Sequence, residues 1–108
     1  MAVQQLNPIY LQHQLQENPN AYFLLDVREP YEYQIAALEN SVLIPMNQIP
    51  EHLLELDKAE PIVVICHHGM RSESIAYYLA EQGFTQVFNL TGGIHAWANS
   101  CDEKMSLY

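Results

Sequence analysis

The chain has 108 residues, which is the usual length of one domain and too short for two ordinary ones. Hydrophobic residues make up 49% of it and charged residues 16%, so there is enough apolar material for one packed core and a disordered chain is excluded. The formal net charge of −9 at pH 7 repels phosphate backbones and anionic lipids, which excludes nucleic-acid and membrane-surface partners.

Two features of the sequence bear on the cellular compartment. The residues after Met1 show neither the basic nor the apolar region of a signal peptide, and no apolar run approaches the ~20 residues that span a bilayer. We therefore expect a cytoplasmic protein. Its two cysteines are Cys66 and Cys101, and counting alone allows a disulfide between them. In the reducing cytosol, however, a cysteine in a loop is more often catalytic than structural.

Short apolar runs alternate with amphipathic stretches along the chain. Asn7 followed by Pro8 is typical of a helix start, with the asparagine as cap and the proline in the first turn. This predicted helix ends near Glu17, and its inner face carries Ile9, Leu11 and Leu15. Four further elements follow: a buried strand over 21–27, one or two helical turns over 30–37, a strand over 42–44, and a helix opened by Pro50.

The second half of the chain holds the clearest strand, 62–65, because its residues are almost all β-branched. A helix over 72–82, a strand over 87–90 and a last helix after the Gly92-Gly93 turn complete the predicted elements. Strands separated by helices predict an α/β fold, a parallel sheet with helices on both faces. Ligands of such sheets bind beyond the carboxyl ends of the strands, so the residues after Val27 and Ile65 are expected at one functional edge.

The loop that joins the clearest strand to the following helix contains Cys66. The thiolate is the reactive form of cysteine, and the N-terminus of a helix attracts negative charge. Arg71 adds a permanent cation, and Gly69 lets successive amides curl around one point as an anion-binding nest. Such a nest suits a thiolate or a persulfide, so we interpret Cys66 as a nucleophile. The alternative is a buried structural cysteine in a tight turn.

Four short motifs, in this order along the chain, resemble the signatures of the rhodanese family. They are Asp26-Val27-Arg28-Glu29 with Glu32-Tyr33, Ile44-Pro45, Cys66-x-x-Gly69-x-Arg71-Ser72, and Gly92-Gly93-Ile94-x-Ala96-Trp97. The resemblance covers about 5–98 of a single domain over 1–108, and it leaves 99–108 as a polar C-terminal tail. It implies the three-layer rhodanese fold, in which a central parallel sheet of about five strands is flanked by helices on both faces.

The resemblance also implies an activity, that of a thiosulfate:cyanide sulfurtransferase. In that reaction Cys66 takes a sulfane sulfur from a donor such as thiosulfate, holds it as a persulfide and passes it to cyanide or another thiophilic acceptor. No metal or organic cofactor is implied. A sulfur-carrier or interaction module that serves a protein donor or acceptor stays open as an alternative.

The persulfide cradle predicted around Cys66 consists of His67, His68, Gly69, Met70, Arg71 and Ser72. Asp26, Arg28 and Glu32 are predicted to support this loop. Arg28 either fixes its turn through a salt bridge with Asp26, Glu29 or Glu32 or binds an anionic donor. The two histidines either contact such a donor or are solvent-facing filler, and they are not interpreted as a metal site because no further ligand is in view. Cys101 is either a resolving thiol or an inert one.

Two departures from related sequences matter for specificity. Many relatives have Gly-His-Ile-x-Gly-Ala where this chain has residues 36–41, Ala-Ala-Leu-Glu-Asn-Ser. Cysteine phosphatases and arsenate reductases of the same fold have five residues between cysteine and arginine, whereas four separate Cys66 from Arg71. The shorter loop suits one sulfur atom better than a phosphate or arsenate, so a phosphatase or arsenate reductase is the less favoured alternative.

Overall fold

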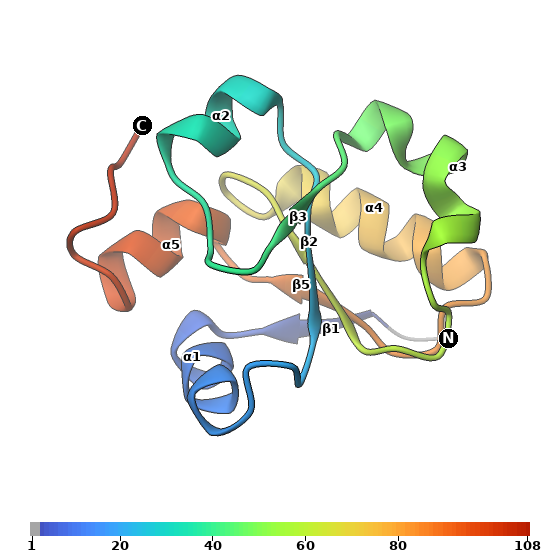
Figure 1. The fold of residues 1–108 in the computed structure, drawn as a ribbon, viewed down its shortest axis with the longest axis horizontal. Coiled ribbons are helices and arrows are strands. Elements are labelled where there is room, and N and C mark those ends of the chain that lie inside the picture. Colours follow the sequence, from blue (N-terminus) through green and yellow to red (C-terminus); the bar gives the residue numbers. More distant parts are fainter. Residues whose placement is uncertain (1–2) are drawn as a thin grey trace.

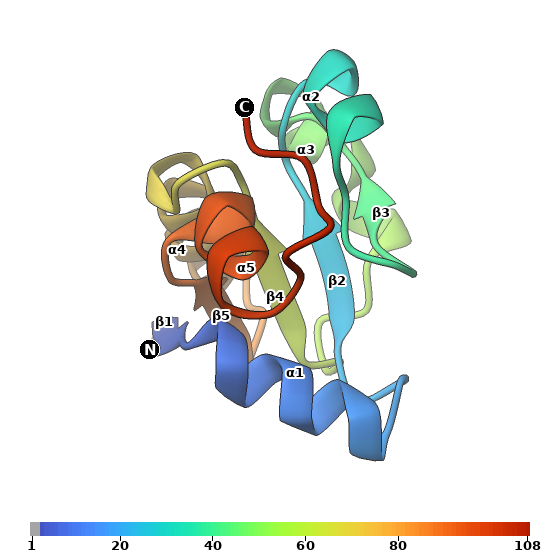
Figure 2. The same cartoon turned by 90° about the vertical axis from the view of Figure 1, so that its left-hand side faces the viewer.

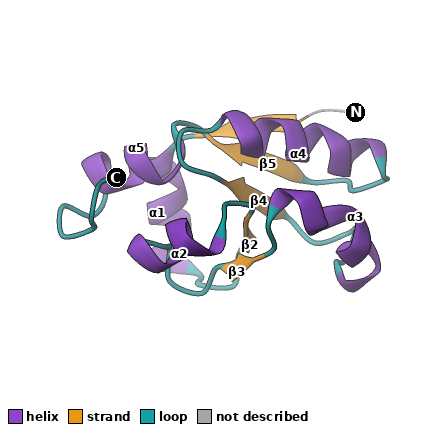
Figure 3. Cartoon of the chain, turned by 90° about the horizontal axis from the view of Figure 1, so that it is seen from above, coloured by secondary structure: helices purple, strands orange, loops and turns teal. Residues whose placement is uncertain are grey.

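A computed structural model describes residues 3–108. Its centre is one parallel sheet of five strands in the order β1-β5-β4-β2-β3 (Figures 1 and 3). The strands are β1 (Val3–Leu6), β2 (Phe23–Asp26), β3 (Val42–Leu43), β4 (Ile62–Ile65) and β5 (Val87–Leu90). The predicted α/β class with a parallel sheet is confirmed.

Within residues 3–108, four α-helices and two short 3-10 turns connect the strands, and a fifth α-helix follows the last strand. The helices are α1 (Pro8–Glu17), α2 (Pro30–Ile35), α3 (Ile49–His52), α4 (Met70–Glu81) and α5 (Gly93–Ser100). The 3-10 turns are η1 (Met46–Gln48) and η2 (Leu53–Glu55), on either side of α3. None of the helices within residues 3–108 has both the length and the apolarity needed to cross a bilayer.

The central strand β4 separates two hydrophobic clusters. Side chains alternate along a strand, so Ile62 and Val64 pack with residues of α3 and α4, whereas Val63 and Ile65 pack with residues of α1 and α5. All four residues are at most 1% exposed, as expected of a strand buried on both faces. Figure 2 shows α1 and α5 together on their side of the sheet. Packing on both faces holds β4 in place, and it therefore also positions Cys66, the residue that follows the strand.

Three details differ from the sequence-based expectations. β1 was not predicted, because Gln4 and Gln5 are exposed in this edge strand and the run has no apolar pattern. Ile9 is 48% exposed and does not belong to the inner face of α1, because the sheet covers the Leu11 side of the helix. The helix predicted from Pro50 is a single turn of α-helix that continues as η2, and its Leu54 is 99% exposed.

The turn from β5 into α5 packs directly against the loop that follows β4. Gly93 has a φ of +61°, and a Cβ atom placed there would lie 2.4 Å from the carbonyl oxygen of Cys66 and 2.5 Å from that of His67. The amides of Ile94 and His95 donate to these same two carbonyls at 2.9 and 3.0 Å. Only a glycine therefore fits at position 93, and the two loops are joined through their backbones.

We predict that Gly93→Ala lowers the free energy of unfolding by about 2 kcal/mol or more, because the new methyl group collides with backbone in an unfavourable φ region. Gly83→Ala is the matched control. Its φ of +96° is equally unfavourable, but the added Cβ would meet only the Lys58 side chain, at 3.7 Å. Urea denaturation of both variants measures the difference, and equal losses would contradict the proposed collision.

Candidate active site

Cys66 lies at the carboxyl end of β4, where the chain turns into α4, and it is 1% exposed. The backbone amide of Gly69 donates a hydrogen bond to the sulfur at 3.1 Å, and the thiol donates to Ser72 Oγ at 3.3 Å. Gly69 has a φ of +101°, a conformation that other residues rarely adopt. The turn that directs this amide at the sulfur therefore depends on glycine. Two residues of the predicted cradle, Gly69 and Ser72, bond the Cys66 sulfur.

The N-terminus of α4 supplies further donors next to the sulfur. The amides of Met70, Arg71 and Ser72 form its first turn, and they bond to no acceptor in the described part of the chain. Among residues 3–108, the amide of Gly69 is the one backbone donor that bonds Sγ. Of the predicted nest of amides, the structure therefore shows one hydrogen bond to the sulfur, and the other three amides lie without an acceptor at the positive end of a 12-residue helix.

A buried polar chain extends from the thiol to the sheet. Ser72 Oγ donates to Asn89 Oδ1, so its single proton is engaged and it accepts the bond from the thiol. The side-chain amide of Asn89 donates to the Gly69 carbonyl at 3.2 Å and to Gln5 Oε1 at 2.9 Å. Sequence reasoning missed Asn89, which is 3% exposed. The available signal was a lone amide inside the otherwise apolar strand β5.

Arg71 forms a bidentate ion pair with Glu32, with distances of 2.7 and 2.9 Å from its two terminal nitrogens to the carboxylate oxygens. The hydrogen bonds from Arg71 are the main reason that the pKa of Glu32 falls to about 2. The pKa of Arg71 is raised, first by Glu32 and to a lesser extent by Cys66. The predicted cation therefore stands near the sulfur, but its charge is largely balanced by the carboxylate of α2.

Asp26 and Arg28 form the second ion pair, and both residues are 0% exposed. Arg28 Nη2 lies 2.7 Å from Asp26 Oδ2 and also donates to the Ala36 carbonyl at 2.6 Å. Arg28 Nη1 donates to the Glu32 carbonyl at 3.3 Å and to the Tyr108 hydroxyl at 2.6 Å. With these donors engaged and no exposed surface, Arg28 fits the salt-bridge alternative and not direct contact with an anionic donor.

The C-terminal segment contributes a residue that sequence reasoning missed. The chain after α5 runs back toward α2 (Figures 1 and 2), and the ring of Tyr108 stacks on that of His67 with centroids 3.8 Å apart. The Tyr108 hydroxyl also donates to Glu32 Oε2 at 2.9 Å. Burial is the main reason that the pKa of Tyr108 rises to about 12. No motif marked this tyrosine, because only the path of the chain brings it to the site.

The remaining predicted residues are divided between the site and its surroundings. His67 is half-buried under Tyr108, whereas His68 and Met70 are exposed, with Met70 at 81%. Cys101 is a partly buried free thiol at the end of α5, and burial raises its pKa. The structure thus gathers Cys66 and its loop with Asp26, Arg28 and Glu32 at one edge, while the catalytic roles of these residues stay predictions.

Comparison with known proteins decides the family. The sequence matches the rhodanese-like domain over residues 8–100. The chain belongs to the rhodanese family. It is 35% identical over 82 residues to the thiosulfate sulfurtransferase GlpE of Pseudoalteromonas translucida, which is 76% of this chain and 78% of that protein. It is 36% identical over 104 residues to the putative sulfurtransferase YtwF of Bacillus subtilis, 96% of this chain and 99% of that one. These names support a rhodanese-type sulfurtransferase.

Solved structures agree with the family assignment. A rhodanese-like domain protein from Staphylococcus aureus is 30% identical and superimposes with a TM-score of 0.84, covering 98% of this chain and 99% of that one. A protein from Rhodopseudomonas palustris described as a possible tyrosine phosphatase superimposes with a TM-score of 0.80 over 91% of this chain and 81% of that one. It is 17% identical, so this likeness shows the fold alone. The predicted rhodanese fold is confirmed.

We predict that Glu32→Gln lowers the free energy of unfolding by about 2 kcal/mol at neutral pH, because it leaves Arg71 without its partner. The pKa of Glu32 is about 2 in the folded protein and 4.5 ordinarily, so the ionised carboxylate stabilises the fold above pH 4.5. That contribution is lost as the pH falls from 4.5 toward 2. Urea denaturation at several pH values measures the gap between the two proteins, and a gap that does not narrow in acid would contradict the assignment.

Proposed function

We propose that this rhodanese is a thiosulfate sulfurtransferase that carries a sulfane sulfur as a Cys66 persulfide and delivers it to cyanide or a thiol. The observation that carries the proposal is the hydrogen bond from the Gly69 amide to the Cys66 sulfur at the N-terminus of α4. An amide and a helix N-terminus both favour an anionic sulfur over a neutral one. The sulfurtransferase names of the relatives support the same reaction class.

The reaction consists of two displacements at sulfur. The Cys66 thiolate attacks the outer sulfur of thiosulfate, a new S–S bond forms, and the S–S bond of thiosulfate breaks as sulfite leaves with the electron pair. Cyanide then attacks the terminal sulfur of the persulfide, which releases thiocyanate and restores the thiolate. The thiol proton goes to solvent before the first step. Thiosulfate itself supplies the sulfane sulfur, so the proposed reaction needs no metal or organic cofactor.

The protein stabilises the negative charge that stays on the sulfur at Cys66 throughout the reaction cycle. Both the attacking thiolate and the persulfide are anions at the same position, next to the Gly69 amide and at the N-terminus of α4. A donor reaches a sulfur that is 1% exposed only if it is small, which favours thiosulfate over a bulky molecule. The persulfide requires a reduced Cys66, and we therefore place the protein in the cytoplasm.

Two alternative functions would use Cys66 differently. A module that serves a protein partner would load Cys66 in the same way but release its sulfur mainly to a protein thiol. The exposed side chains of Met70 and Tyr31, 81% and 67% exposed, are apolar surface that such a partner could contact. A phosphatase or arsenate reductase would need a wider loop than the four residues between Cys66 and Arg71.

The decisive experiment is intact-mass analysis after incubation with thiosulfate. We expect the wild-type protein to gain about 32 Da, the mass of one sulfur, and to release thiocyanate when cyanide is added. Cys66→Ser should show neither change. Cys101→Ser is the matched control and should behave as wild type, because its thiol lies outside the loop.

Three outcomes of this experiment would contradict the proposed function or part of it. No mass gain on wild type, together with hydrolysis of p-nitrophenyl phosphate, would overturn the proposal in favour of a phosphatase. Rapid persulfide transfer to a protein thiol with slow thiocyanate release would replace the proposed acceptor by a protein. A mass gain that persists in Cys66→Ser and disappears in Cys101→Ser would show that the nucleophile is assigned to the wrong cysteine.

We predict that Arg71→Ala slows sulfur loading by about tenfold and leaves the fold intact, because the guanidinium that links the loop to α2 is lost. Arg71→Lys keeps the positive charge without the bidentate pairing, so its loading rate should lie between those of Arg71→Ala and wild type. Stopped reactions analysed by mass spectrometry give the three rates. Equal rates would show that Arg71 takes no part in loading.

A further inference from the structure

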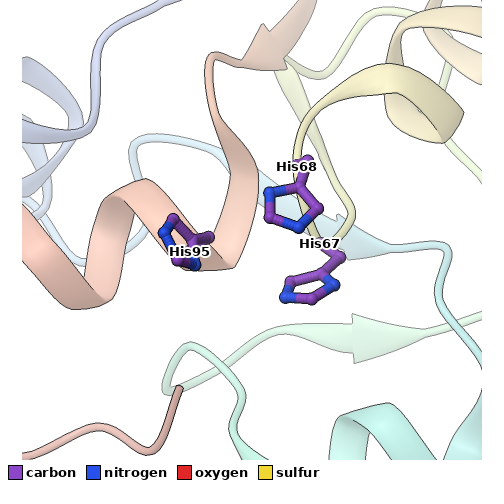
Figure 4. Close-up of side chains that lie close together, drawn as sticks. All are labelled: His67, His68 and His95. Carbon is purple, nitrogen blue, oxygen red and sulfur yellow. The ribbon is translucent and has the colours of Figure 1, made fainter. Parts of the chain in front are cut away.

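Three histidine rings meet at the carboxyl ends of β4 and β5 (Figure 4). His67 and His68 follow β4, and His95 stands in the first turn of α5. One ring nitrogen from each residue lies within 4.8 Å of those from the other two. No local pattern places His95 here, since it lies 27 positions after His68 in the helix predicted after the Gly92-Gly93 turn. We call these three residues the histidine cluster.

The backbone holds the histidine cluster together. The His95 amide donates to the His67 carbonyl at 3.0 Å, and the neighbouring Ile94 amide donates to the Cys66 carbonyl at 2.9 Å. Gly93 permits this approach because it has no Cβ. Tyr108 stacks on the outer face of His67 with an angle of 5° between the rings. Backbone contacts, which do not depend on the histidine side chains, therefore bring the three residues together.

Two nitrogens of the histidine cluster have no partner. His67 Nε2 and His95 Nδ1 are buried, and within residues 3–108 they are the side-chain nitrogen or oxygen atoms that are both buried and without a hydrogen bond. Burying such an atom unpaired costs about 1–3 kcal/mol. Elsewhere in this site the polar side chains are paired, as the Arg28 and Arg71 ion pairs show. Two orphaned nitrogens in one cluster indicate a ligand that the chain does not supply.

The chemistry of the surroundings favours a cation over an anion. Burial, and next the charge of His68, lower the pKa of His67. Both neighbouring arginines are already paired with carboxylates, and the chain as a whole carries a net charge of −9. An anion would need protonated rings or a free cation here. Neutral imidazoles are instead the common ligands of zinc, copper and nickel ions.

We propose that His67, His68 and His95 bind one divalent transition-metal ion, with Zn²⁺ as the reference ion. Three imidazole nitrogens satisfy three positions of a tetrahedral ion and leave the fourth for water or a small ligand. With Zn–N bonds of about 2.1 Å, the three nitrogens must approach one another to about 3.4 Å. Rotations of the side chains can supply this movement, since His68 is exposed. The expectation that the site holds no metal, made without His95, is revised accordingly.

The test is a titration of the full chain with Zn²⁺ by calorimetry and with Co²⁺ by visible absorption. Both are done in the Cys66→Ser background, so that the thiolate next to the cluster contributes no binding. We expect one equivalent of Zn²⁺ to bind, and the visible bands of tetrahedral Co²⁺ to appear. His95→Ala should weaken Zn²⁺ binding by about 100-fold, in line with the loss of one ligand from three. His13→Ala, at an exposed position of α1, should bind as the parent does.

His68→Ala gives a second route to the same answer, because an exposed ring contributes little to folding and its loss should also weaken binding. The proposal is overturned if the parent binds no Zn²⁺ in a saturable way, or if His95→Ala and His68→Ala bind it as well as the parent. Calorimetric binding of sulfate that depends on His95, without binding of Zn²⁺, would show that the cluster is an anion site and would likewise overturn it. The readouts are independent of sulfur transfer, so failure of one proposal leaves the other standing.

Discussion

The structure depends on one placement: the sulfur of Cys66 is fixed where β4 ends and α4 begins, with the Gly69 amide 3.1 Å away. This placement needs a strand buried on both faces, a glycine in the left-handed region and a helix that starts at once. Burial alone would raise the cost of an anionic sulfur. The amide and the helix N-terminus oppose that cost, and this balance is the basis of the proposed persulfide on Cys66.

A network of paired charges surrounds this point and joins four parts of the chain. Asp26 ends β2 and Arg28 follows it, Glu32 belongs to α2, Arg71 to α4, and Tyr108 lies beyond α5. Because each charge has a partner, the network holds the loops in place without presenting a strong field of its own. The backbone bonds of Ile94 and His95 complete the frame from the side of β5. The cysteine loop is thus held by the ion pair with α2, by the network that includes Tyr108, and by the backbone of α5.

The edge of the sheet carries two kinds of chemistry side by side. Cys66 lies beneath the loop with its hydrogen-bond needs met by Gly69 and Ser72. The rings of the histidine cluster lie next to it with two nitrogens unmet. The chain therefore satisfies the hydrogen bonds of Cys66 by itself, whereas the histidine cluster lacks partners that an additional ligand would supply. Both arise because parallel strands bring their following loops to the same edge.

Much of this protein could be predicted from the sequence, where the determining information is local. The β-branched run 62–65 specified the central strand, Asn7-Pro8 specified the start of α1, and four motifs identified the family and the loop of the predicted nucleophile. Other features depend on contacts between distant segments, which local patterns do not encode. The edge strand β1, the bond of Asn89 to Ser72, the return of Tyr108 and the arrival of His95 beside His67 are of this kind. The sequence by itself determined the fold class and the cysteine loop, and only the tertiary structure decided which partners each side chain has, because packing brings together residues that lie 80 or more positions apart.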